Sequence, residues 1–187
     1  MKKLARFDFT SNSINQGMRE GVEEAVRNHL VSLVPSIVDR QGKLPPYITM
    51  EVGFYTNLME EARRCYEFGL FHATVSMIGI AAERFCMELS DYLKFFVNEK
   101  QISEKELYNK GFNHYRRLLF LLKAQLITKD TYNLLDEIRT IRNKYIHPSE
   151  IEDVEEDAII VIKKFNEIIK SRFSERYEIR EGKIVPR

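Results

Sequence analysis

The chain has 187 residues, of which 44% are hydrophobic and 30% are charged. These proportions are typical of a globular domain with its own core, and they exclude low-complexity and collagen-like sequences. The formal net charge of +1 excludes a protein that binds polyanions through overall charge, so any contact with nucleic acid requires a local basic patch.

Helical periodicity dominates most of the chain. A first helix is expected over residues 14–40, where Pro35 should kink or restart it. The stretch QGKLPPY then interrupts helical structure, and residues 47–55 alternate weakly, as in a strand or an extended lead-in. The next helix, over 60–69, should stop at Gly69.

The longest expected helix spans 70–98. Its stretch ATVSMIGIAAERFCMEL is apolar or small nearly all round, which predicts a helix at the centre of a bundle. Ser103 and Glu106 form a capping box for a short helix that ends before Gly111. A further helix over 113–125 has a basic side and an apolar side.

Two helices complete the expected bundle. Thr128 or Asp130 should cap the helix that carries TYNLLDEIRTIRNKYIH. This helix should end at His147, because Pro148 disfavours helical geometry in the residue before it. The last helix is expected over 150–174, and its capping box is formed by Ser149 and Glu152.

The short connections make sequential helices neighbours, so we expect an all-α fold, an antiparallel helical bundle around one long central helix. We divide the chain into an N-terminal helix and linker over 1–50, a helical bundle over 51–175 and a C-terminal tail over 176–187. The tail predicts either a small hairpin about Glu181-Gly182 or a disordered end.

Targeting and metal signals do not occur in the sequence. The start, MKKLARFDFTSNS, lacks the apolar core of a signal peptide, and no apolar run is long enough to span a membrane. The cysteines Cys65 and Cys86 form no CxxC pattern, and the four histidines follow no ligand spacing. We therefore expect a cytoplasmic protein with reduced thiols, no metal and no other cofactor.

One position breaks the pattern of the helix that ends at His147. Arg142 falls on the same helical face as an apolar stripe formed by Leu134, Leu135, Ile138, Ile141 and Tyr145. A guanidinium cannot lose its proton, so it must reach solvent, find a carboxylate or meet a second chain. Glu83, within the apolar central helix, is well placed to pair with it, and such a pair can be purely structural.

Arg139, Asn143 and His147 are spaced four apart, which predicts an outward row on the opposite side of this helix. His147 lies at a helix C-terminus and precedes the acidic run SEIEDVEED, and both features raise the pKa of its imidazole. A raised pKa suits a general acid. The simpler interpretation is a histidine that satisfies the last carbonyl groups of the helix.

The stretch RNKYIH, residues 142–147, resembles the R-x4–6-H motif of the HEPN superfamily, whose domains are small all-α bundles in many prokaryotic defence and toxin systems. The polar Asn143 after the arginine is also the usual form of that motif. Residues 60–85 resemble the helix pair before the motif in HEPN-like domains of otherwise unknown function. The resemblance covers residues 55–170. The short motif is informative because it lies on the last-but-one helix of a bundle and is followed by a proline.

The resemblance implies a metal-independent endoribonuclease that acts as a homodimer, with arginine and histidine from two subunits in one cleft. Arg142 would stabilise phosphate charge, His147 would act as general acid and base, and Asn143 would hold the imidazole or the phosphate. The implied partners are single-stranded RNA and an antitoxin protein. The antitoxin would be a separate protein, because this chain carries no nucleotidyltransferase segment.

Two other interpretations stay open. The chain could be a non-catalytic HEPN-like module that binds a nucleotide or a protein, or a helical interaction protein in which Arg142 forms only a structural ion pair. Arg116, Arg117 and Arg139 are candidate RNA-contact residues, although the basic side of helix 113–125, which begins near His114, is more simply a solvated edge. We interpret the other two histidines, His29 and His72, as structural.

Overall fold

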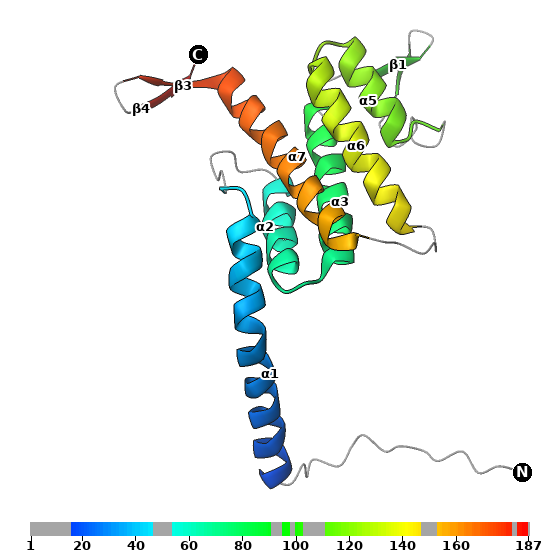
Figure 1. The fold of residues 1–187 in the computed structure, drawn as a ribbon. Helices are drawn as coiled ribbons and strands as arrows, with labels where there is room; N and C mark the ends of the chain where they lie inside the picture. The colour runs from blue at the N-terminus through cyan, green and yellow to red at the C-terminus, as the bar shows by residue number, and fades with distance from the viewer. Residues whose placement is uncertain are drawn as a thin grey trace, which may run out of the picture.

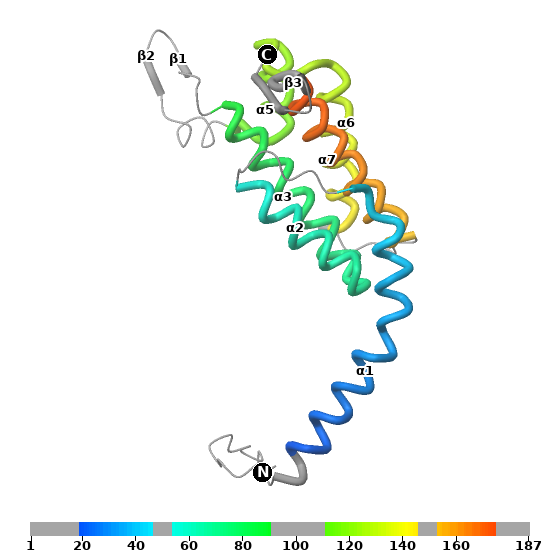
Figure 2. Tube along the Cα trace, turned by 90° about the vertical axis from the view of Figure 1, so that its left-hand side faces the viewer, coloured from blue at the N-terminus to red at the C-terminus, as the bar shows by residue number. Residues whose placement is uncertain are grey.

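The computed structural model describes residues 16–46, 54–90, 95–97, 100–102, 111–146, 153–180 and 183–186. The fold is all-α, as expected: five helices pack into one bundle and another, α1, extends away from it (Figures 1 and 2). Two short antiparallel hairpins are attached to the bundle. Within these described ranges, no helix combines the length and the apolar character needed to cross a membrane.

Helix α1 (Gln16–Lys43) is shifted by two or three residues from the expected 14–40. It continues through Pro35, so the expected restart at this residue is wrong. A proline removes one backbone hydrogen bond from a helix, and the remaining bonds of α1 are sufficient to keep it helical. Gly42, which was expected in a break, lies in the last turn, and the helix ends before Pro45.

Helix α2 (Phe54–Glu67) begins earlier than the expected 60–69, so Phe54 and Tyr55 are helical, whereas 47–53 lie outside the described residues. The expected stop at Gly69 is confirmed. Gly69 has φ +77°, its N–H donates to the carbonyl of Tyr66, and the N–H of Leu70 donates to the carbonyl of Cys65. These two bonds form a Schellman turn, in which glycine adopts the left-handed conformation without steric cost.

Helix α3 (Phe71–Ser90) lies at the centre of the bundle and packs against α2, α5, α6 and α7. The central position of the apolar helix is therefore confirmed, but its expected end at residue 98 is wrong. Strand β1 (Phe95–Val97) pairs antiparallel with β2 (Lys100–Ile102). Aromatic and β-branched residues at 95–97 favour strand geometry over helix. The short helix expected between Ser103 and Gly111 falls mostly on 103–110, outside the described residues.

Helices α5 (His114–Lys123) and α6 (Lys129–Ile146) match the expected segments, and side-chain caps fix where they begin. Asn113 accepts a hydrogen bond from the backbone N–H of Arg116 at 3.0 Å. Thr128, rather than Asp130, caps α6, because its Oγ1 accepts from the backbone N–H of Thr131 at 3.1 Å.

Helix α7 (Val154–Arg176) corresponds to the expected last helix, shifted by a few residues. Residues 147–152 lie outside the described part of the chain, and with them His147 and the expected Ser149–Glu152 capping box. The expected C-terminal hairpin is present, since β3 (Tyr177–Arg180) pairs antiparallel with β4 (Lys183–Pro186).

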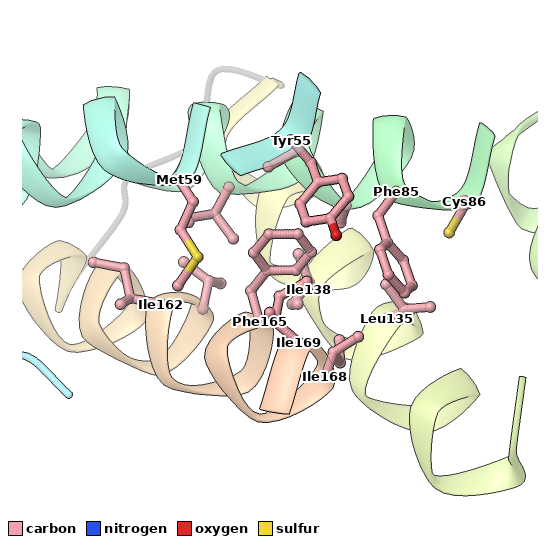
Figure 3. Packing of buried hydrophobic residues seen from close by; sticks show 14 of the residues in the cluster. Tyr55, Met59, Phe85, Cys86, Leu135, Ile138, Ile162, Phe165, Ile168 and Ile169 are labelled. Carbon is pink, nitrogen blue, oxygen red and sulfur yellow. The ribbon is translucent and has the colours of Figure 1, made fainter. Parts of the chain in front are cut away.

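The core lies between α3 and the helices around it (Figure 3). Tyr55, Phe85 and Phe165 meet edge to face, with ring centroids 5.4–6.2 Å apart, and aliphatic side chains of α6 and α7 pack around them. Among the described side chains, none from α1 belongs to this buried core. The bundle therefore holds α3 and α6 firmly, while α1 contributes almost nothing to their packing.

Candidate functional site

Helices α3 and α6 run antiparallel and bring the two predicted partners together. The Nη1 of Arg142 donates a hydrogen bond to Oε1 of Glu83 at 2.9 Å. The side chains keep 25% and 33% of their surfaces exposed, so the ion pair is half-buried rather than enclosed. The pairing expected from the sequence is present, at the edge of the bundle and within reach of solvent.

The stem of Arg142 lies directly on Gly79 of α3. A Cβ atom at Gly79 would be 2.7 Å from Cγ and 2.8 Å from Cδ of Arg142, closer than non-bonded carbon atoms approach. The absence of a side chain at residue 79 therefore allows α6 to come close to α3 at this point. This contact aims the guanidinium toward Glu83, one turn further along α3.

Arg139 and Asn143 lie one turn apart on α6 as expected, but both are half-buried. The Nε of Arg139 donates to Oδ1 of Asp136 at 2.8 Å, and its guanidinium lies 5.2 Å from the ring centroid of Tyr115 on α5. The attraction of the carboxylate and of the aromatic ring turns Arg139 toward α5. Asn143 is half-buried on α6.

Helix α6 is described to Ile146, and the expected end at His147 lies outside the described residues. Its last turn is anchored to α7 by Asp157, whose Oδ2 accepts from the Tyr145 hydroxyl at 2.9 Å and from Nζ of Lys144 at 3.3 Å. Burial, together with this bond to Asp157, raises the pKa of Tyr145, which keeps its hydroxyl protonated as the donor. The position of His147 itself lies outside the described residues.

His72 lies near the same end of α6, which the sequence did not indicate. The exposed imidazole contacts the ring of Tyr145 edge to face, with centroids 5.4 Å apart. His72 comes from the first turn of α3, far from Tyr145 in the chain, so sequence spacing contained no signal for this contact. An imidazole that the motif does not include is thus present beside the last described turn of α6.

His114, at the first turn of α5, is the other histidine near the pair. Burial, and after it the positive charges of Arg117, Arg139 and Arg142, lower the pKa of His114 to about 4 against an opposing effect of Asp136. His114 is therefore neutral near pH 7 and adds no positive charge beside Arg142. A side chain of the site that gains or loses a proton between pH 6 and 8 must therefore be one other than His114.

The two candidate RNA-contact arginines of α5 have different surroundings. Arg116 is exposed, as a phosphate contact requires. Arg117 is only 3% exposed; its Nη1 donates to Oγ of Ser90 at 2.7 Å and its guanidinium lies 5.5 Å from the centroid of Phe112. The prediction that Arg117 contacts RNA is wrong, because a buried guanidinium with these partners cannot reach a phosphate.

The arrangement places a fixed, half-exposed cation next to the segment that carries His147. A guanidinium held at one side by a carboxylate still has N–H groups directed elsewhere, which can bind a phosphate oxygen. Among the residues predicted for the site, the structure brings Arg142 and Glu83 together. Asn143 lies on the same helix as Arg142, whereas Arg117 is buried and cannot contribute to the site.

A family model described as "Domain of unknown function (DUF4145)" matches residues 60–183, which include α3, α6 and the complete RNKYIH motif. No curated protein matches the chain. No solved structure matches it either. Since the matched region covers about two thirds of the sequence, the chain belongs to the DUF4145 family.

Proposed function

We propose that this protein is a metal-independent endoribonuclease of HEPN type that acts as a homodimer on single-stranded RNA. A defence or toxin context, a separate antitoxin protein and a cytoplasmic location belong to the same proposal. Its basis is the resemblance of RNKYIH to the HEPN motif, together with the geometry of Arg142.

One observation carries the proposal: Arg142 is held in place and remains partly exposed directly before the segment with His147. Glu83 and the contact with Gly79 fix its guanidinium, while a quarter of the side-chain surface stays open. A preorganised cation of this kind stabilises charge that develops on a phosphate without having to reorganise during the reaction.

The reaction that fits these residues is attack of an RNA 2′-oxygen on the phosphate attached to the same ribose. The 2′-oxygen loses its proton and forms a bond to the adjacent phosphorus, while the bond from phosphorus to the 5′-oxygen of the next nucleotide breaks. The leaving oxygen takes up a proton. His147 can accept the first proton and donate the second, or its copy in the other subunit can share the two roles. Arg142 stabilises the negative charge of the pentavalent phosphorus, and Asn143 holds the imidazole or a phosphate oxygen.

A second candidate function is a non-catalytic module that binds a nucleotide or a protein. It is favoured by the fact that both arginines near the motif already have carboxylate partners, Arg142 with Glu83 and Arg139 with Asp136. The net charge of +1 favours it as well, because little long-range attraction would draw RNA to the protein.

Binding and cutting separate the two functions. We expect His147→Ala to retain its affinity for a single-stranded RNA oligonucleotide, measured by fluorescence anisotropy, and to lose cleavage of the same oligonucleotide in EDTA. An equal affinity of both proteins, with cleavage by neither, would support the binding module instead. Circular dichroism should verify that His147→Ala leaves the bundle folded.

A further inference from the structure

Tyr115, in the first turn of α5, is an aromatic side chain that is exposed and yet held in place. It keeps 42% of its surface open, and the guanidinium of Arg139 on α6 lies 5.2 Å from the centroid of its ring. Arg139 is fixed in turn, because its Nε donates to Oδ1 of Asp136 at 2.8 Å. A side chain that is fixed before binding loses little conformational entropy when a ligand packs against it. The open part of the ring is therefore a preorganised surface for another planar group.

The ring adjoins the surface that carries Arg142. Arg139 and Arg142 lie one turn apart on α6, and each side chain keeps 25% of its surface exposed. Helices α5 and α6 pack side by side (Figure 1). Burial, and after it the charges of Arg117, Arg139 and Arg142, lower the pKa of His114, the residue before Tyr115, so the start of α5 lies close to these guanidinium groups. A chain-like ligand bound to Arg142 therefore has Tyr115 within its reach.

The charges around the ring suit an anionic ligand that carries planar groups. Arg116, next to Tyr115 in the sequence, is exposed. Arg139 and Arg142 each bind a carboxylate, but each of these bonds uses one of the five N–H donors of a guanidinium. Cations interleaved with an aromatic ring are typical of surfaces that bind single-stranded nucleic acids, because the cations attract the phosphates and the ring stacks on a base.

We propose that Tyr115 stacks on a base of single-stranded RNA, in the nucleotide next to the phosphate that Arg142 binds. The choice of RNA and of Arg142 as the phosphate site rests on the proposed function. Tyr115 contacts a base and not the reacting atoms, so it is a substrate-positioning residue. Every base has a planar face, so this contact strengthens binding and orients the strand without reading its sequence. Bases inside a duplex are stacked on one another, and the contact therefore requires a single strand.

A purely structural role for Tyr115 predicts a different result. As a cover for Arg139, the ring would matter for stability and for the position of that guanidinium. Its loss would then change the binding of any phosphate chain, with or without bases. A stacking contact depends on the base itself, so an RNA backbone that lacks its bases separates the two roles.

Fluorescence anisotropy with two labelled ligands makes this comparison. One ligand is an RNA of eight uridines, and the other is a matched chain of eight abasic ribose phosphates with the same charge. All proteins are full-length and carry His147→Ala, so that the RNA stays uncut. In this background, Tyr115→Ala and Tyr115→Leu remove the planar ring, and Leu retains apolar volume. Tyr115→Phe retains the ring, and Phe68→Ala removes an aromatic side chain of similar exposure in the turn before α3.

We expect Tyr115→Ala and Tyr115→Leu to bind the uridine RNA roughly 5- to 100-fold more weakly than the His147→Ala parent, the usual effect of losing one stacked base. Their affinity for the abasic chain should stay that of the parent. Tyr115→Phe and Phe68→Ala should bind both ligands as the parent does. Equal losses for the two ligands, no loss for the uridine RNA, or a parent that does not bind the uridine RNA would overturn the proposal.

Cleavage distinguishes a failure of this inference from a failure of the proposed function. If wild type does not cut RNA but the Tyr115 variants lose affinity only for the uridine RNA, the stacking contact stands and the ribonuclease proposal fails. If wild type cuts RNA and the Tyr115 variants bind both ligands as the parent does, the ribonuclease proposal stands and the stacking contact is wrong.

Discussion

Arg142 and Glu83 form an ion pair across the contact between α6 and α3, with Nη1 and Oε1 2.9 Å apart and both side chains partly open to solvent. Water screens part of their attraction, so the pair contributes less stability than an enclosed one. The same openness leaves the guanidinium accessible to a phosphate. Exposure of Arg142 therefore weakens its contribution to stability but allows it to bind a phosphate, and both effects can be measured.

Glu83→Gln should lower the free energy of unfolding by about 1 kcal/mol, between the values typical of exposed and enclosed ion pairs. Urea denaturation measures this change. The matched control is Glu60→Gln, which removes the exposed pair between Glu60 and Arg64 on α2 and should cost less than about 0.5 kcal/mol. If the two variants are equally stable, the pair with Arg142 has no structural role.

Gly79→Ala should destabilise the protein by about 1–3 kcal/mol, because the new methyl group overlaps the stem of Arg142 and α3 and α6 must separate or the arginine must move. Thermal and urea denaturation both report this loss. Gly21→Ala is the control, since an added Cβ there meets no atom within 4 Å. Alanine favours helix over glycine, so the control should show no loss of stability. A Gly79→Ala protein as stable as wild type would contradict the close contact.

His114 should make stability depend on pH in the acidic range. Its pKa is about 4 in the folded chain and about 6.5 when unfolded, so the unfolded chain binds more protons between these values. The contribution is complete above pH 6.5 and is lost as the pH falls toward 4, by at most about 3 kcal/mol. His114→Gln should therefore lose less stability than wild type between pH 6.5 and 4.5. Parallel curves for the two proteins would show that His114 has an ordinary pKa.

Arg117→Ala should cost about 2–4 kcal/mol, because it removes a buried side chain and the hydrogen bond that Oγ of Ser90 accepts from Nη1 of Arg117. Arg116→Ala, the exposed neighbour, should change stability by less than about 0.5 kcal/mol. If RNA binds near α5, only the Arg116 variant should weaken that binding in protein shown to be folded. A loss of RNA affinity in folded Arg117→Ala would contradict the structural role.

Local signals in the sequence predicted much of the fold. The stop at Gly69 and the cap at Thr128 each depend on a few adjacent residues, whose backbone preferences are strong. The pairing of Glu83 with Arg142 was also predictable, because a charge on an apolar helix face requires a partner and few candidates exist.

Other features depend on contacts between distant segments and had no local signal. Arg117 is buried because Ser90 and Phe112 are available to it, and the pKa of His114 depends on burial and then on arginines from two helices. Periodicity extended α3 too far, because apolar residues at 95–97 suit a strand as well as a helix. The apolar residues of α1 predicted a helix, but not that the helix would remain outside the core.

The most direct measurement of the proposed function is cleavage of single-stranded RNA in EDTA by wild type and His147→Ala, both free of host nucleases, with analysis of the product ends. We expect wild type to leave a 2′,3′-cyclic phosphate, because the 2′-oxygen is the nucleophile, and to leave the matching DNA uncut. His147→Ala should be slower by about 10²–10⁴-fold, the usual contribution of a general acid or base. Equal cleavage by both proteins, or cleavage by neither, would contradict a catalytic role for His147 and favour the non-catalytic module.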